Sequence, residues 1–268
     1  MNLRLLAWNV HGLPAPLTRK RRARLRRIAA QVAREAPDLV TFEEAWGGSV
    51  RLLCRELPSY LPFFVRAPAT VAAGGLLCLV RDNGNWRATA RPRFRRYSLQ
   101  APAWKLWQGD GAAGKGALFV ALDGPGGPLC LAATHLQSRY PGQPYRQVRV
   151  AQLRELARWM DEIGAATPIL VCGDLNTPAT DEEYPLLVAP LGTDLTTDAQ
   201  GTGAVTNYPT RSSAAWIDYA IARLPRNCSA RSSTRLILND AADEPYSDHH
   251  GLVVDIEITG AGRSGESS

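Results

Sequence analysis

Polar residues that could carry out phosphoryl chemistry occur where several apolar, strand-like runs of this chain end. Asn9 ends the first run, the pair Glu43 and Glu44 ends the second, and Asp174 follows the short run 168–172. Because a sheet delivers the side chains at its strand ends into a common cleft, we expect these residues to meet in one site. The residues assigned to that site are Asn9, Glu44, His135, Asp174, Asn176, Asp218, Asp248 and His249.

The chemistry that these residue types support is cleavage of a phosphodiester. Carboxylate and amide oxygens form a hard-oxygen ligand set that suits Mg²⁺, or alternatively Mn²⁺. Such an ion stabilises negative charge on phosphoryl oxygens. A histidine oriented by a carboxylate can handle the proton of an attacking water, and amide groups can donate hydrogen bonds to the phosphate. The sequence therefore predicts metal-assisted hydrolysis.

Each of these residues also has a purely structural interpretation. Asn9 could cap a turn, Asp174 could begin a helix, and Asp218 could pair with a surface arginine. His249, next to His250, could be a solvated residue before a strand. Since all of these coincidences would have to occur together, the joint catalytic interpretation is favoured.

Three neighbours of the predicted site residues need a separate decision. Successive side chains of a strand point to opposite faces, so only one of Glu43 and Glu44 should face a metal. His11 and His250 are expected to be bystanders.

If Asp218 orients His249, the pKa of His249 should lie above its unperturbed value of ~6.5.

The elements that must position these residues are strands with a few helices. Strands are predicted over 3–10, 38–44, 60–66, 75–81, 86–97, 117–123, 129–135, 168–172, 215–222, 229–238 and 251–258, and helices over 18–36 and 145–163. Many strands with few helices predict two packed sheets flanked by helices. Since the site residues run from Asn9 to His249, residues 1–259 are expected to form one domain, followed by a disordered tail over 260–268.

Cysteine usage and hydropathy bear on the cellular compartment. The five cysteines are scattered and form no CxxC pair, which favours a reducing compartment over a disulfide framework. The N-terminus does not read as a signal peptide, and no run approaches the roughly 20 apolar residues of a membrane span. We expect a cytoplasmic monomer.

The net charge of +6 has a local origin. Residues 19–27, RKRRARLRR, hold seven basic residues and no acidic one. This block could bind nucleic acid or contact an anionic membrane surface as a peripheral element. The alternative is a solvated helix face, with Leu25, Ile28, Ala29 and Val32 turned inward.

Six segments in chain order resemble one enzyme superfamily. LLAWNVHGLP, TFEEAW, ATHLQS, CGDLNTP, WIDYA and SDHHGLVV are similar to the motifs of the endonuclease/exonuclease/phosphatase (DNase I-like) superfamily, across nearly the whole chain. The resemblance implies an α/β (α+β) fold, a four-layer αββα sandwich of two mostly antiparallel sheets. Within the superfamily, EEAW, THLQS and YRQVRVAQLRELA most resemble the neutral sphingomyelinase-type branch, which cleaves phospholipid phosphodiesters.

The resemblance also implies a role for each matched residue. The family spacing selects Glu44 as the principal metal ligand, with Asn9 and Asp248 near the ion. Asp174 would position or deprotonate the water, and His249 would act as base or stabilise the transition state. The remaining matches are Asp218, orienting His249; His135 and Asn176, contacting the phosphate; and Lys115, in a loop associated with substrate binding.

Three functions are compatible with this chain. The first is a Mg²⁺-dependent phosphodiesterase acting on a phospholipid, and the second is a nuclease acting on DNA or RNA. The third is a binding module that has kept the fold without catalysis. The complete set of acids, amides and histidines disfavours the third.

Overall fold

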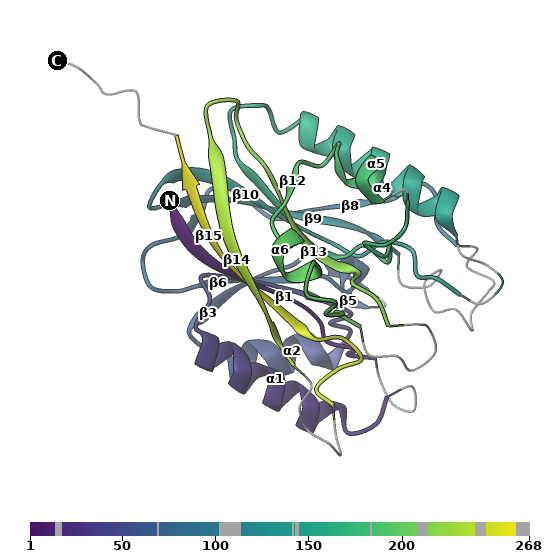
Figure 1. Cartoon of the computed structure of the whole chain (residues 1–268). Helices are drawn as coiled ribbons and strands as arrows, with labels where there is room; N and C mark the ends of the chain where they lie inside the picture. The colour runs from purple at the N-terminus through teal and green to yellow at the C-terminus, as the bar shows by residue number, and fades with distance from the viewer. Residues whose placement is uncertain are drawn as a thin grey trace.

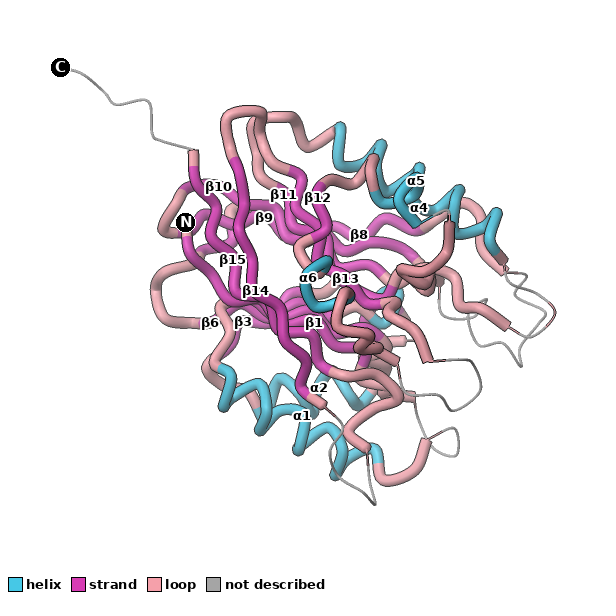
Figure 2. Tube along the Cα trace, viewed as in Figure 1, coloured by secondary structure: helices cyan, strands magenta, loops and turns pink. Residues whose placement is uncertain are grey.

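Two β-sheets packed face to face form the centre of the molecule (Figures 1 and 2). The computed structural model describes residues 1–13, 18–68, 70–101, 114–140, 142, 145–182, 184–207, 214–238 and 245–260. Of the predicted tail, 261–268 lie outside the described residues.

The first sheet has six strands and collects both ends of the described chain. Its order is β14 (Ser229–Ile237), β15 (Gly251–Thr259), β1 (Asn2–Asn9), β2 (Leu39–Glu43), β6 (Leu77–Arg81) and β3 (Tyr60–Phe63). Helices α1 (Arg21–Glu35) and α2 (Gly48–Glu56) cover its outer face (Figure 1). The predicted apolar face of α1 is confirmed, since Leu25, Ile28 and Val32 are fully buried in one cluster with Leu6 and Trp8 of β1.

The second sheet has seven strands. Its order is β12 (Thr193–Asp194), β13 (Asp218–Arg223), β11 (Ile169–Asp174), β10 (Gly127–Thr134), β9 (Gly116–Gly124) and β7 (Arg87–Ala88), with β8 (Arg93–Arg96) also paired to β9. Helices α4 (Arg146–Asp161) and α5 (Tyr184–Val188) lie on its outer side (Figure 1). The smaller elements are β4 (Arg66–Ala67), β5 (Val71–Ala72), η1 (Ala73–Gly75) and α6 (Thr197–Gln200). The predicted αββα layering is confirmed.

Two parallel strand pairs interrupt the mostly antiparallel sheets and explain where the site lies. α1 connects β1 to β2, and α4 connects β10 to β11, each as a crossover between parallel neighbours. Parallel strands end at the same edge, so Asn9 lies opposite Glu43. In the other sheet Asp174 lies opposite Asp218 of the antiparallel neighbour β13. The two crossovers therefore bring polar strand ends to one end of the molecule.

Several predicted elements differ in extent from the observed ones. The predicted strand 86–97 is two short strands, β7 and β8, separated by a segment that contains Pro92, which lacks a backbone donor. The predicted strand 60–66 ends at Phe63. α2 was not predicted, although Val50 and Leu53 have helical spacing and are both buried. None of the helices in the described ranges is long and apolar enough to span a membrane.

Candidate active site

The predicted site residues converge where the ends of β1, β2, β10 and β11 meet the start of β13. The backbone of Gly173, in β11, approaches that of Thr134, in β10, very closely. A Cβ at position 173 would lie 1.9 Å from the Thr134 carbonyl oxygen, and φ there is +136°, so only glycine fits. This close approach brings His135 next to Asp174.

Three buried side chains, joined by one hydrogen bond and one longer ion-pair contact, form the centre of the site. His249 Nδ1 lies 2.8 Å from Asp218 Oδ2, and His249 Nε2 lies 3.6 Å from Asp174 Oδ2. Asp174 and Asp218 are each 2% exposed and His249 is 7% exposed. The imidazole is therefore oriented on both sides by carboxylates. The predicted pairing of Asp218 with His249 is present in the structure.

Burial and excess negative charge determine the protonation of this chain. Burial alone would lower the pKa of His249, but Asp218 and Asp174 together raise that pKa well above its ordinary value. Burial also raises the pKa of Asp174 to about 7, with the negative charge of Asp218 adding to the shift. The pKa of His249 thus moves in the predicted direction. One carboxylate of the site is left ready to accept a proton near neutrality.

His135 lies against the same carboxylate. Its Nε2 is 3.4 Å from Asp174 Oδ2, while its Nδ1 is buried and has no hydrogen-bond partner. Burial, followed by the charge of Lys115, lowers the pKa of His135 well below its ordinary value, so this histidine is neutral. Lys115 itself is 2% exposed and stands at the start of β9, beside His135. The structure thus brings the predicted Lys115 and His135 together.

Asn9 links two carboxylates of the site. Its Nδ2 donates to Glu44 Oε1 at 3.2 Å and to Asp174 Oδ2 at 3.3 Å. Its Oδ1 accepts a hydrogen bond from the backbone N–H of His11 at 3.1 Å, which fixes the orientation of the amide. Asn9 therefore presents a donor to the carboxylates. The geometry supports a role for Asn9 in holding Glu44 and Asp174 together, and its role as a metal ligand stays a prediction.

The adjacent residues Glu43 and Glu44 have very different surroundings. Glu43 is fully buried between the sheets, and neither of its carboxylate oxygens has a hydrogen-bond partner. Burial, with the nearby charges of Asp218 and Asp174, raises the pKa of Glu43 well above its ordinary value. Glu44 adopts φ 55° after the strand ends, is half-buried, and contacts Asn9. Of the two, Glu44 is the more exposed to solvent and contacts Asn9.

Asp248 lies beside His11, a histidine that was not assigned to the site from the sequence. His11 Nδ1 lies 2.8 Å from Asp248 Oδ2. Burial opposes ionisation of Asp248, but the hydrogen bond from His11 and the charge of His249 hold its pKa below the ordinary value. The structure thus brings His11, which was expected to be a bystander, into direct contact with the predicted ligand Asp248. Strand alternation could not have indicated this contact, because β1 ends at Asn9 and His11 has φ 44°.

Asn176 completes the predicted set from the segment after β11. Its backbone N–H donates to Asp174 Oδ1 at 2.8 Å, and its Nδ2 donates to the carbonyl oxygen of Leu136 at 3.1 Å. The residue adopts φ 49°, a left-handed conformation that asparagine tolerates. Asn176 therefore fixes the carboxylate of Asp174 and ties it to the segment that carries His135.

The donor set fits a divalent cation with oxygen ligands. Asp174, Asp218 and His249 can each offer a ligand atom within 4.8 Å of the others. In that trio, however, His249 Nδ1 is already engaged by Asp218, so His249 is better suited to proton handling than to metal ligation. Glu44 and Asp248 add half-exposed carboxylates to this donor set. Burial, with the negative charge of Asp218 adding to it, raises the pKa of Asp174, and a bound cation would favour the charged form of this carboxylate.

Comparison with known families and sequences identifies relatives of this chain. The family model described as "Endonuclease/Exonuclease/phosphatase family" matches residues 6–249. Nocturnin of Drosophila melanogaster is 24% identical over 173 residues, covering 63% of this chain and 25% of that protein. The uncharacterized protein YbhP of Escherichia coli is 31% identical over 155 residues, covering 56% of this chain and 55% of that protein. The match thus spans from a quarter to about half of these relatives' length.

Solved structures share the fold at low sequence identity. TDP2 of D. rerio, in complex with a single strand DNA product, has a TM-score of 0.74 at 19% identity, covering 96% of this chain and 99% of that one. Sphingomyelinase C of Streptomyces griseocarneus has 0.70 at 17%, covering 95% and 99%. A beta toxin variant of Staphylococcus aureus with bound magnesium ions has 0.69 at 16%, covering 95% and 99%.

Proposed function

The chain belongs to the endonuclease/exonuclease/phosphatase family, and from this premise we propose that it is a Mg²⁺-dependent phosphodiesterase that cleaves a phospholipid phosphodiester by attack of water. The observation that carries the proposal is the buried chain Asp218–His249–Asp174, with the more exposed carboxylates Glu44 and Asp248 beside it. A cytoplasmic monomer whose residues 1–259 act as one domain is part of the same proposal, supported by five free cysteines.

Proton handling follows from the different protonation of the two central groups. Asp174, with a pKa of about 7, accepts a proton from the attacking water at neutral pH. His249 donates its Nδ1 proton to Asp218 and keeps a proton on Nε2, because carboxylates raise its pKa. This imidazolium stabilises the negative charge that develops on the phosphoryl oxygens. His249 thus acts mainly by charge, and the role of base falls to Asp174.

The remaining residues bind and orient. His135, neutral and buried, offers a hydrogen bond to a phosphate oxygen, and Lys115 beside it offers a positive charge. Glu44 and Asp248 would hold the magnesium ion, with Asn9 fixing the position of Glu44. When bound, the ion supplies charge stabilisation to the phosphoryl oxygens and the leaving group. Manganese would fit the same oxygen ligands.

A cluster of buried polar groups supports the phospholipid assignment. The segments THLQS and YRQVRVAQL, which resemble the sphingomyelinase-type branch, contact one another directly. The backbone N–H of Gln137 donates to Gln152 Oε1 at 2.9 Å, and Arg149 Nη1 donates to the Gln137 carbonyl oxygen at 3.3 Å. The two segments thus form one structural unit beside His135. Because both segments are present and in contact, we infer that this chain shares the substrate class of the sphingomyelinase-type branch.

A nuclease is the second candidate, because of the basic residues that begin α1. Arg19 and Arg22 are exposed and Arg21 is half-exposed, near the loop that follows Asn9. Positive side chains beside a phosphodiester site suit a polyanionic strand. The relationship of the fold to that of the TDP2 complex with DNA is compatible with this alternative.

A turnover panel tests the proposal and separates the two candidates. We expect Mg²⁺-dependent cleavage of sphingomyelin or lysophospholipids, and of a soluble chromogenic phosphodiester, with plasmid and abasic-site DNA left intact. Turnover by protein stripped of metal in excess EDTA would overturn the metal mechanism. Cleavage of DNA in place of lipid would favour the nuclease. In that case, reversing Arg19, Arg21 and Arg22 to Glu should weaken DNA cleavage, most strongly at low salt.

Two adjacent glutamates provide a matched pair of variants for the metal. Glu44→Gln should raise the Mg²⁺ concentration needed for half-maximal turnover by ~10–100-fold or more, the range seen when metal-site partners are lost. Glu43→Gln should change it only a few-fold, since Glu43 lies buried behind the site. The opposite ranking would mean that Glu43 is the ligand.

A further inference from the structure

The basic block 19–27 is not a uniform charged surface. Arg26 pairs with Glu56 on α2, and Arg27 stacks over the ring of Tyr246 at 4.4 Å. Arg24 differs from both, because it is 9% exposed and its guanidinium points under the helix. Neither sequence interpretation, a solvated face or a binding surface, accounts for a buried arginine at this position.

The Arg24 guanidinium joins three segments that are distant in sequence. Nη1 donates to the carbonyl oxygens of Tyr246 at 2.6 Å and Val10 at 3.3 Å. Nη2 donates to the carbonyl oxygen of His11 at 2.8 Å and to Thr18 Oγ1 at 2.9 Å. Arg24 thus connects α1 to the segment after β1 and to the segment before β15.

Those two segments, 9–11 and 246–249, carry Asn9, His11, Asp248 and His249. They also contact each other directly. Ser247 Oγ donates to the Asn9 carbonyl oxygen at 2.6 Å, and His11 Nδ1 lies 2.8 Å from Asp248 Oδ2. Trp8 Nε1 donates to the His249 carbonyl oxygen at 3.0 Å. Apart from Asn9, both segments lie outside the named strands, where backbone hydrogen bonds from Val10 to Glu43 and from His250 to Thr206 hold them in part. Arg24 adds donors to three of their carbonyl groups.

The chemistry of arginine suits this position better than that of lysine. A planar guanidinium presents five N–H donors in a fixed arrangement, whereas an ammonium offers three donors from one point. One point cannot reach Val10, His11 and Tyr246 together while also contacting Thr18. Loss of the guanidinium would leave these carbonyl groups without their Arg24 donors, which destabilises the observed arrangement of the two segments.

We propose that Arg24 is a positioning residue of the active site, holding the segments of Asn9–His11 and Tyr246–His249 in the geometry that binds the divalent ion and orients His249. The proposal rests on the proposed function and deepens it. Arg24 itself contacts neither the substrate nor the ion. It acts through the backbone of His11 and Tyr246, and so sets the separation of Asp248 from Glu44.

The test compares Arg24→Lys and Arg24→Gln with Arg34→Gln, an exposed residue on the same helix. Mg²⁺ affinity is measured on the full chain from the rise in Tm with Mg²⁺ concentration. The expected loss of affinity is ~10–100-fold for both Arg24 variants and none for Arg34→Gln. With a soluble chromogenic phosphodiester, kcat should fall while KM changes only a few-fold.

A spectroscopic measurement separates positioning from general stability. The indole N–H signal of Trp8, identified with Trp8→Phe, reports the hydrogen bond to His249. It should shift in Arg24→Lys, while the indole signals of Trp86 and Trp159 stay in place. A lower Tm with unchanged Mg²⁺ affinity and an unchanged Trp8 signal would reduce Arg24 to a packing residue and overturn the proposal.

Two possible outcomes of this test need additional experiments. If both Arg24 variants fail to fold, Thr18→Val removes one contact of the guanidinium, and a Mg²⁺ affinity equal to that of the unchanged chain would overturn the proposal. If the unchanged chain binds Mg²⁺ but cleaves no phosphodiester, the proposed function fails. In that case Arg24 is still judged by Mg²⁺ affinity and the Trp8 signal.

Discussion

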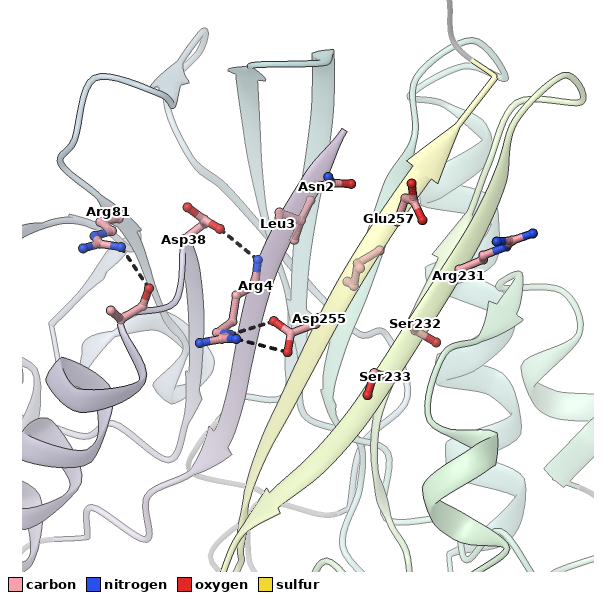
Figure 3. A pocket seen from close by; sticks show the side chains of 12 residues that line it. Asn2, Leu3, Arg4, Asp38, Arg81, Arg231, Ser232, Ser233, Asp255 and Glu257 are labelled. Atoms are coloured by element: carbon pink, nitrogen blue, oxygen red, sulfur yellow. Dashed lines mark hydrogen bonds and ion pairs between the residues drawn. The ribbon is translucent and has the colours of Figure 1, made fainter.

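Charged side chains cluster near both ends of strand β1, where Arg4 contacts Asp255 and Asn9 contacts Asp174, but the two clusters are built differently. At the end away from the site, a hollow of about 670 Å³ is lined by residues of β1, β14 and β15 (Figure 3). There Arg4 binds Asp255 through two contacts, of 2.6 and 3.2 Å, with side chains 38% and 44% exposed. At the site end, Asp174 and Asp218 are each 2% exposed.

The difference lies in how charge is balanced. In the hollow, the acid Asp255 has a cationic partner and water nearby, so the pair contributes little to the free energy of unfolding. At the site, Glu43, Asp174 and Asp218 surround a single imidazolium, and burial raises the pKa of Glu43 and Asp174. Excess buried charge is costly to stability, and it is also what prepares groups for binding a cation and moving protons. Three experiments can break or sharpen this comparison.

The largest effect is expected from His249 and its carboxylate. His249→Ala should lower kcat by ~10²–10⁴-fold, because a positioned charge and proton donor is lost. Asp218→Asn should cost less, since the imidazole remains but loses its orientation. Because residues that act as a unit are not additive, the double variant should be little worse than His249→Ala. Turnover of a chromogenic phosphodiester at saturating Mg²⁺ measures all three.

Multiplicative losses in the double variant would mean that Asp218 and His249 act independently. The site would then resemble the hollow at the other end, where the charged pair has no shared task. Asp255→Asn serves as the matched control for removing a carboxylate, and its kcat should equal that of the unchanged chain.

A smaller effect concerns the stability of the metal-free protein between pH 6.5 and 8. Asp174 and His249 both have raised pKa values, so the folded state holds more protons than the unfolded state in this window. The free energy of unfolding should therefore fall as pH rises, by about 1.4 kcal/mol per pH unit for each proton held only in the folded state. The lowered pKa values of His135 and His250 oppose this trend most strongly below about 6.5, and less as pH rises further, because the unfolded histidines lose their charge over that range. Urea unfolding in EDTA measures the slope.

Two controls connect that slope to the buried cluster. Saturating Mg²⁺ should flatten or reverse it, because the ion binds the deprotonated carboxylates. Asp174→Asn should reduce it near pH 7, whereas Asp255→Asn should leave it unchanged. A rise in stability with pH in the metal-free protein would contradict the raised pKa values.

The smallest effect is expected at the far end of the sheet. Asp255→Asn should lower the free energy of unfolding by about 0–1 kcal/mol, and the difference should shrink further at high salt. Chemical denaturation at 0.1 and 1 M salt measures it. A loss of several kcal/mol, or a loss of turnover, would mean that the hollow is more than a solvated, paired surface.

Local sequence patterns predicted most of the scaffold and the central residues of the site. Apolar runs with polar ends predicted β1, β2, β10 and β11, and helical spacing predicted the buried face of α1. Strand-end position also selected Asp218 and His249, which are in hydrogen-bond contact. These inferences succeed because the alternation and periodicity of side chains along a single element depend on backbone geometry alone. These local patterns did not predict the break between β7 and β8, and they did not predict α2.

The sequence by itself determined which groups can do chemistry here. They are carboxylates, amides and histidines at the ends of apolar, strand-like runs. Only the tertiary structure decided which of them are paired, buried or exposed. Glu43 is buried between the sheets while Glu44 is half-exposed, and His11 contacts Asp248. Arg24, unlike its basic neighbours, is buried and contacts two loops. Such differences depend on contacts between segments more than 200 residues apart, as in Arg24 with Tyr246 at a separation of 222. Burial and partnership of a charge are properties of the packed molecule, and no local pattern encodes them.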